Sequence, residues 1–204
     1  MPHDCLVPIS AIKDIIVAVA AIVTAFTALR GLKKWQDELR GKTEYEVARR
    51  VIKALYKVKD GFNAVRSAAI WTSEFPEVIQ GESRSRLSDT EERKAHTHVY
   101  QNRWNCLTEA LRELDIEALD AEVIWGQDIE QLMQEIRACR NELQVAIKQY
   151  LASITSNQKE ANYDADMKLV GKVSDFDGSN DEFSKKIESA IKALEDKMRP
   201  HLKH

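Results

Sequence analysis

The sequence predicts an all-α protein, in which an N-terminal transmembrane helix is followed by an antiparallel four-helix bundle. Three observations lead to this prediction. Residues 15–29 form a run without charge, Pro or Gly. Behind it, four stretches each carry one apolar stripe at steps of three and four residues, which is the helical period. Gly and Pro are scarce, at 7 and 4 of 204 residues, and 31% of residues are charged, a composition that favours long helices.

The apolar run at 15–29 is the core of the predicted transmembrane helix, which we place at residues 9–34. A span needs about 20 apolar residues, and apolar side chains from Ile9 to Leu32 bring the run to that length. A helix of this length, rising about 1.5 Å per residue, crosses a hydrocarbon layer of about 30 Å. A buried helix of a soluble domain is the stronger alternative, although the run is apolar on all faces. A cleaved signal peptide would carry its basic residues before the run, not after it.

Basic residues concentrate on the C-terminal side of the run. By the positive-inside rule, this asymmetry places a short N-terminus (1–8) outside and residues 35–204 in the cytoplasm. Basic side chains next to a membrane exit attract anionic lipid, contributing about 1 kcal/mol each. We therefore expect four residues to contact lipid headgroups: Lys33, Lys34, Arg40 and Lys42.

Small residues recur at every fourth position of the run, at Ala20, Thr24 and Ala28. Such spacing lets two helices approach closely in lipid, so this face is a candidate for self-association of the span. The alternative is that Ala is simply common in apolar helices.

The first bundle helix is expected at residues 43–69. Thr43 with Glu46 has the pattern of a capping box, and Gly41 is expected to kink or interrupt the join to the transmembrane helix. Gly61 lies inside the helical pattern, where it costs about 1 kcal/mol. The apolar stripe consists of Ala48, Val51, Leu55, Val58, Phe62, Val65 and Ala69.

Three further helices are expected behind it. The second begins at a cap on Asp89 or Thr90 and ends near Leu114, and residues 115–125 form a short helix or a turn before one. The third begins at an Asp128 cap, and the fourth covers 180–198, after a long acidic loop at 155–180. The expected stripe of the third helix is Ile129, Leu132, Ile136, Cys139, Leu143, Ala146, Tyr150 and Ile154. That of the fourth is Phe183, Ile187, Ala190, Ile191, Leu194 and Met198.

Cysteine and histidine positions indicate structural roles. Cys106 and Cys139 fall on apolar stripes, which predicts two small core residues. His96 and His98 lie two apart on a helix and so point to different faces, which predicts surface or rim positions. Residues 175–182 alternate oxygen-bearing side chains as a calcium loop does, but the Gly spacing fails, which favours a turn followed by a helix cap.

No catalytic motif is present, so we expect a protein that is not an enzyme and binds no cofactor or metal. Glu-x-x-His, which di-iron bundles require on two helices, does not occur. Gly-rich phosphate loops and nucleophile motifs are also missing. The net charge of −3 gives no indication of nucleic-acid binding.

One stretch resembles a group of uncharacterised bacterial single-span membrane proteins. Residues 35–44 read Trp-x-x-Glu-Leu-Arg-Gly-Lys-x-Glu directly after the predicted span, and residues 121–126, Ala-Glu-Val-Ile-Trp-Gly, are similar to a second shared segment. The resemblance implies a bacterial inner-membrane protein and carries no activity with it.

These observations lead to a functional hypothesis of a membrane-anchored helical interaction module. Its expected partners are membrane lipid, a protein that the sequence does not identify, and a second copy of itself. The alternative is a membrane effector of a defence or signalling system, which senses a ligand through the bundle and acts through the span. An enzyme with a site between the helices is a third alternative.

Overall fold

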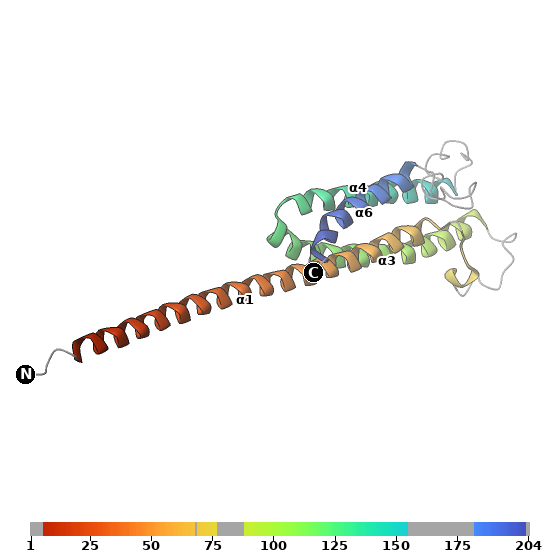
Figure 1. The fold of residues 1–204 in the computed structure, drawn as a ribbon. Coiled ribbons are helices and arrows are strands. Elements are labelled where there is room, and N and C mark those ends of the chain that lie inside the picture. Colours follow the sequence, from red (N-terminus) through yellow and green to blue (C-terminus); the bar gives the residue numbers. More distant parts are fainter. Residues whose placement is uncertain (1–5, 68, 77–87, 155–181, 203–204) are drawn as a thin grey trace, which may run out of the picture. The chain divides into compact units, whose positions relative to one another are not determined.

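The protein is all-α throughout the residues that its structure, a computed structural model, describes: 6–67, 69–76, 88–154 and 182–202. These ranges contain no strand, which confirms that the protein is all-α there, as predicted. The helices are α1 (Leu6–Val65), the 3-10 helix η1 (Thr72–Glu74), α3 (Asp89–Trp125), α4 (Asp128–Ser153), α6 (Glu182–Met198) and the 3-10 helix η3 (Arg199–Leu202) (Figure 1). The expected loop at 155–180 lies outside the described residues.

The chain divides into two units, residues 1–45 together with the terminal residue 204, and residues 46–203. Helix α1 runs through the boundary without interruption, so the predicted break near Gly41 is wrong. The predicted cap on Thr43 is wrong as well. Its hydroxyl donates to the carbonyl oxygen of Leu39 at 3.0 Å, the back-bond that Thr makes inside a helix. The residues on both sides of Gly41 are compatible with a helix, and together they outweigh the cost of one Gly, which is only about 1 kcal/mol.

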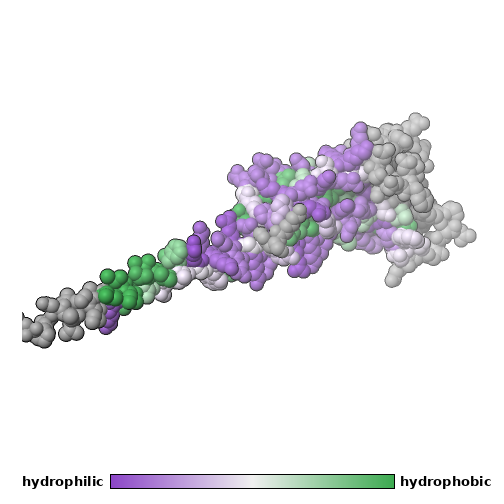
Figure 2. Space-filling view, viewed as in Figure 1, coloured by the Kyte–Doolittle hydropathy of each residue, from purple (hydrophilic) through white to green (hydrophobic). Residues whose placement is uncertain are grey.

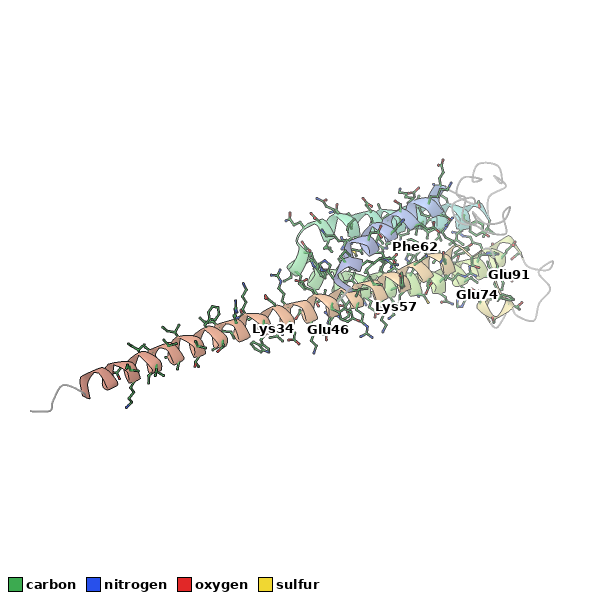
Figure 3. All side chains as sticks on the ribbon, in the orientation of Figure 1. Lys34, Glu46, Lys57, Phe62, Glu74 and Glu91 are labelled. Carbon is green, nitrogen blue, oxygen red and sulfur yellow. The ribbon has the colours of Figure 1, made fainter. Side chains whose placement is uncertain are left out.

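Unit 2 has a single hydrophobic core, to which α1, α3, α4 and α6 all contribute. The predicted stripe of the first bundle helix is buried from Ala48 to Val65, and Phe62, labelled in Figure 3, is only 1% exposed. Ala69 is different, because α1 ends at Val65 and leaves Ala69 exposed beyond it. Burying a large apolar side chain is worth about 1.5–3 kcal/mol, so this shared core is the main stabilising feature of the unit.

Helix α3 begins one residue earlier and continues further than the sequence suggested. Ser88, not Asp89 or Thr90, is the cap: its Oγ accepts from the Glu91 backbone N–H at 3.4 Å, and Glu91 Oε2 accepts from the Ser88 N–H at 2.9 Å. The helix does not stop near Leu114, because buried alanines at positions 118 and 121 extend its apolar stripe. It ends at Gly126, whose φ of 85° suits Gly best.

The remaining two helices follow their predicted stripes closely. In α4, Met133 is fully buried while Leu132 is only partly buried, so the stripe shifts by one residue there. Asp128 does not cap α4; its carboxylate pairs with Lys197 at 3.1 Å. In α6 all six predicted apolar residues are buried. The two helices therefore present their stripes to the common core.

Arg103 ties α3 to the segment that follows α1. Its guanidinium donates to the carbonyl oxygens of Ser67 at 2.8 Å and Ala69 at 2.7 Å, and to both carboxylate oxygens of Glu74 at 2.6 and 2.8 Å. The side chain is only 9% exposed. These hydrogen bonds lower the pKa of Glu74 below its ordinary value, and they hold η1 against α3.

Two residue-level predictions are wrong. His96 is buried, packs edge-on against Phe75 and Tyr150 with ring centroids 5.9 and 6.0 Å apart, and places Nδ1 3.4 Å from the Tyr150 hydroxyl. Cys106 is exposed, whereas Cys139 is buried as expected. The helical period alone does not decide which polar or small side chains the neighbouring helices bury.

Candidate membrane anchor and interaction surface

The apolar part of α1 is exposed along its whole length. Its large hydrophobic side chains between Ile12 and Leu29 are 53–68% exposed, and Figure 2 shows them as an apolar band on the helix. Within the described residues, α1 is the one helix long and apolar enough to cross a membrane, with a mean hydropathy of 2.2 over its best window and none of that window buried. This makes it a candidate membrane-spanning helix near the N-terminus.

The two threonine hydroxyls inside the uncharged run at 15–29 are hydrogen-bonded within the helix. Thr24 donates its hydroxyl hydrogen to Ala20 O at 2.8 Å, and Thr27 lies 3.0 and 2.9 Å from the oxygens of Val23 and Thr24. An unsatisfied hydroxyl in hydrocarbon would be costly. These bonds make the segment compatible with a lipid environment.

The proposed self-association residues lie at helical steps of four on one face of α1. Ala20, Thr24 and Ala28 are all exposed. Thr24 already bonds to Ala20, so its hydroxyl needs no second helix for a partner. Close approach through this face remains a prediction.

All four predicted headgroup residues are exposed on α1. Lys33 and Lys34 lie within about two turns of Leu29. Arg40 is further along, and its Nε donates to Glu44 at 2.9 Å across one turn. That pair reduces the positive charge available to lipid at Arg40, so Lys33 and Lys34 are the stronger candidates.

Sequence reasoning did not identify the role of Arg30. Its guanidinium carbon lies 4.4 Å from the ring centroid of Phe26, one turn earlier, a cation–π distance. This contact places the first charge after the apolar run against an aromatic ring. Trp35, five residues further along α1, is exposed as well.

Unit 2 has a polar groove of about 480 Å³ between α1 and α6. Beside it, the Tyr56 hydroxyl donates to Glu195 at 2.7 Å, which raises the pKa of Tyr56 and lowers that of Glu195. Arg199 also bonds to Glu195. The residues that line the groove are Lys59, Glu188, Ile191, Lys192, Glu195, Asp196 and Arg199. Three of these side chains are basic and three are acidic, so the groove does not concentrate one sign of charge.

A smaller hollow of about 130 Å³ lies between α3 and α4. Trp104 lines it, and Arg140 stands over the Trp104 ring at 5.7 Å from the centroid. The other residues of the hollow are Thr97, Tyr100, Gln101, Gln144, Ile147, Lys148 and Leu151. Its size suits a single side chain better than a cofactor.

The C-terminal part of α3 exposes an apolar stripe that the sequence analysis did not identify. Ile116, Leu119 and Val123 are 60%, 63% and 87% exposed. Their steps of three and four place them on one helix face. The signal was present in the sequence, because this second apolar set recurs at helical steps on the side of α3 away from the buried residues Leu114 and Ala118. We call these three residues the α3 stripe.

No group of three or more His, Cys, Asp or Glu side chains is placed to hold a metal ion in the part of the chain that the structure describes. Residues 175–181 of the calcium-like segment lie outside it. Comparison with protein-family models, curated proteins and solved structures gave no match.

Proposed function

We propose that this protein is a membrane-anchored interaction module, in which α1 anchors a helical domain that binds a protein partner. One observation carries the proposal. A single helix, α1, has an apolar part whose large side chains are exposed up to Leu29 and, from Ala48, a stripe buried in the core of unit 2. Water does not stabilise the first part, whereas a bilayer would. The second part belongs to a domain with its own core.

We further propose that unit 2 is an antiparallel four-helix bundle. In three pairs of helices, successive contacts join residues whose numbers rise along one helix and fall along the other, which is the antiparallel order. For α1 and α3, Arg50 pairs with Glu117 at 2.7 Å and Lys57 with Glu113 at 2.6 Å. The same order holds for α1 with α6 (Tyr56–Glu195, Arg66–Ser184) and for α4 with α6 (Asp128–Lys197, Glu142–Lys186).

The proposed location is a bacterial inner membrane, with a single span, the N-terminus outside and the C-terminal part in the cytoplasm. The excess of basic residues after the apolar part supports this orientation. Lys33 and Lys34 would meet anionic headgroups there. The basis of the proposal is the exposed apolar side chains of α1 and α3. We propose neither nucleic-acid binding nor catalysis.

Membrane fractionation tests the anchor. We expect the full-length chain to remain in carbonate-washed membranes and to be released by detergent, whereas a truncation beginning at Lys42 stays soluble and helical. Replacing Val19 and Ile22 with Arg in the full chain should release it too. Val145→Arg is the matched control, because Val145 is a similarly exposed apolar residue on α4. A full-length chain that carbonate extracts would refute the proposal.

One observation favours the alternative of a ligand-sensing effector. Lys59, which lines the 480 Å³ groove, lies on α1, the helix that also contains the apolar part. A ligand in this groove would therefore contact the anchoring helix itself. Proteolysis of the full chain in liposomes, with and without a metabolite library, would detect such a ligand as changed protection of α1.

A further inference from the structure

The α3 stripe brings together three of the exposed large hydrophobic side chains of unit 2. Ile116, Leu119 and Val123 lie on the face of α3 away from its core residues, which include Leu114 and Ala118. Exposed apolar residues scattered singly are normal, whereas residues gathered on one face mark an interaction surface. Steps of three and four suit a second helix laid against α3.

Acidic side chains surround the stripe. Between positions 109 and 123, α3 carries one basic residue, Arg112, and six acidic residues: Glu109, Glu113, Asp115, Glu117, Asp120 and Glu122. Three basic side chains of neighbouring helices reach four of these acids: Arg50 pairs with Glu117 and Asp120, Lys57 with Glu113, and Arg137 with Asp115. The acids still exceed the bases, and Asp115 and Asp120 remain 44% and 58% exposed.

The end of the helix adds to this negative potential. The last turn of α3 contains no basic residue, and it includes Glu122. A helix C-terminus carries a partial negative charge, which a cation there stabilises. The apolar stripe thus ends where a positive charge would be favoured. The last turn of α3 supplies no such charge.

We propose that the α3 stripe is the docking surface for a basic amphipathic helix of a partner protein. This inference rests on the proposed function and specifies the partner's chemistry. The apolar residues of the partner helix, at steps of three and four, cover Leu119 and its neighbours. Its Lys and Arg residues face the acidic rim and the C-terminus of α3. An anionic lipid surface is repelled by this rim, and a second copy presenting the same stripe would bring acids against acids.

Peptide binding to the full-length chain in nanodiscs tests the proposal. The probes are a labelled amphipathic Lys/Leu peptide, a Glu/Leu peptide with the same Leu positions, and a Lys/Leu peptide of scrambled order. Anisotropy is measured against empty nanodiscs of the same neutral lipid. We expect the Lys/Leu peptide alone to bind, and its affinity to fall as salt rises.

Two variants locate the binding site. Leu119→Ser should weaken binding by about tenfold or more, as truncation of a central interface residue does. Val145→Ser removes a comparably exposed apolar residue from α4 and should leave binding unchanged. Glu122→Lys should weaken it by reversing a rim charge. Circular dichroism confirms that the variants stay folded.

Several results would overturn the inference. These are no binding of the Lys/Leu peptide, equal binding of the Glu/Leu peptide, and equal binding to the Leu119→Ser variant. Wild-type chains that self-associate, with Leu119→Ser restoring monomers, would assign the stripe to a second copy instead. Each result leaves the fractionation test of the anchor unaffected, so failure of this surface and failure of the proposed function are distinguishable.

Discussion

Gly61 of α1 lies close to Leu107 of α3. A Cβ atom added at Gly61 would lie 3.0 Å from Leu107 Cδ1, 3.1 Å from Leu107 Cα and 3.4 Å from Leu107 Cβ. Rotation of the Leu107 side chain relieves the contact with Cδ1 but not the contact with Cα. In a Gly61→Ala variant α3 must therefore move away from α1, or the two helices must deform.

The expected size of the effect follows from two opposing contributions. Ala is better than Gly inside a helix by about 1 kcal/mol, while an extra methyl in a packed core costs about 1–3 kcal/mol. Because one of the contacts is with backbone, we expect the upper part of that range and a net loss of about 1–2 kcal/mol. For a chain of this size the midpoint of unfolding should fall by about 2–8 °C.

Gly31→Ala is the matched control, because it is the same substitution in the same helix. A Cβ atom at Gly31 has no other atom within 4 Å, so only the propensity contribution remains. We would measure thermal unfolding of both full-length variants in detergent micelles by circular dichroism. A Gly61→Ala protein at least as stable as the wild type would show that the helices separate at no cost, and the packing argument would be wrong.

Three further predictions concern Arg103, Glu74 and the two described cysteines. Arg103→Lys should lower the free energy of unfolding, measured by chemical denaturation, by about 1–3 kcal/mol, because an ammonium cannot reproduce the guanidinium's four hydrogen bonds. Arg112→Lys is the control, because Arg112 is exposed. Since the pKa of Glu74 is lowered from 4.5, its stabilising contribution should be complete above about pH 4.5 and lost as pH falls through its lower folded value, and Glu74→Gln should flatten that part of the stability–pH curve. A thiol reagent should modify Cys106 and spare Cys139, which is buried with a raised pKa, as mass spectrometry of the labelled peptides would show.

Each of these three predictions has an outcome that would contradict it. Equal losses in Arg103→Lys and Arg112→Lys would mean that the Arg103 hydrogen bonds add no stability. An unchanged stability–pH curve in Glu74→Gln would assign the acid sensitivity to other carboxylates. Rapid labelling of Cys139 under native conditions would indicate that its part of the core opens readily.

The local pattern predicted helices well where a stripe faces one side only. The spacing from Ala48 to Val65 and from Phe183 to Met198 identified buried positions almost one for one, because a 3.6-residue period leaves few choices of face. Boundaries were less predictable. A Gly and a Thr with a capping-box pattern often mark the end or the start of a helix, yet Gly41 and Thr43 both lie inside α1. Helix-forming neighbours on each side outweigh the preference of these two residues for a helix end.

The sequence by itself determined the helical class, the apolar run at 15–29 and the face that the helices of unit 2 bury, because these depend on composition and period alone. The tertiary structure alone decided that Arg103 binds Glu74, that Gly61 lies against Leu107 and that the α3 stripe is exposed. These features join residues far apart in the chain or depend on which face a neighbouring helix covers. A one-dimensional pattern can show that a face is apolar, but only packing decides whether another helix covers it.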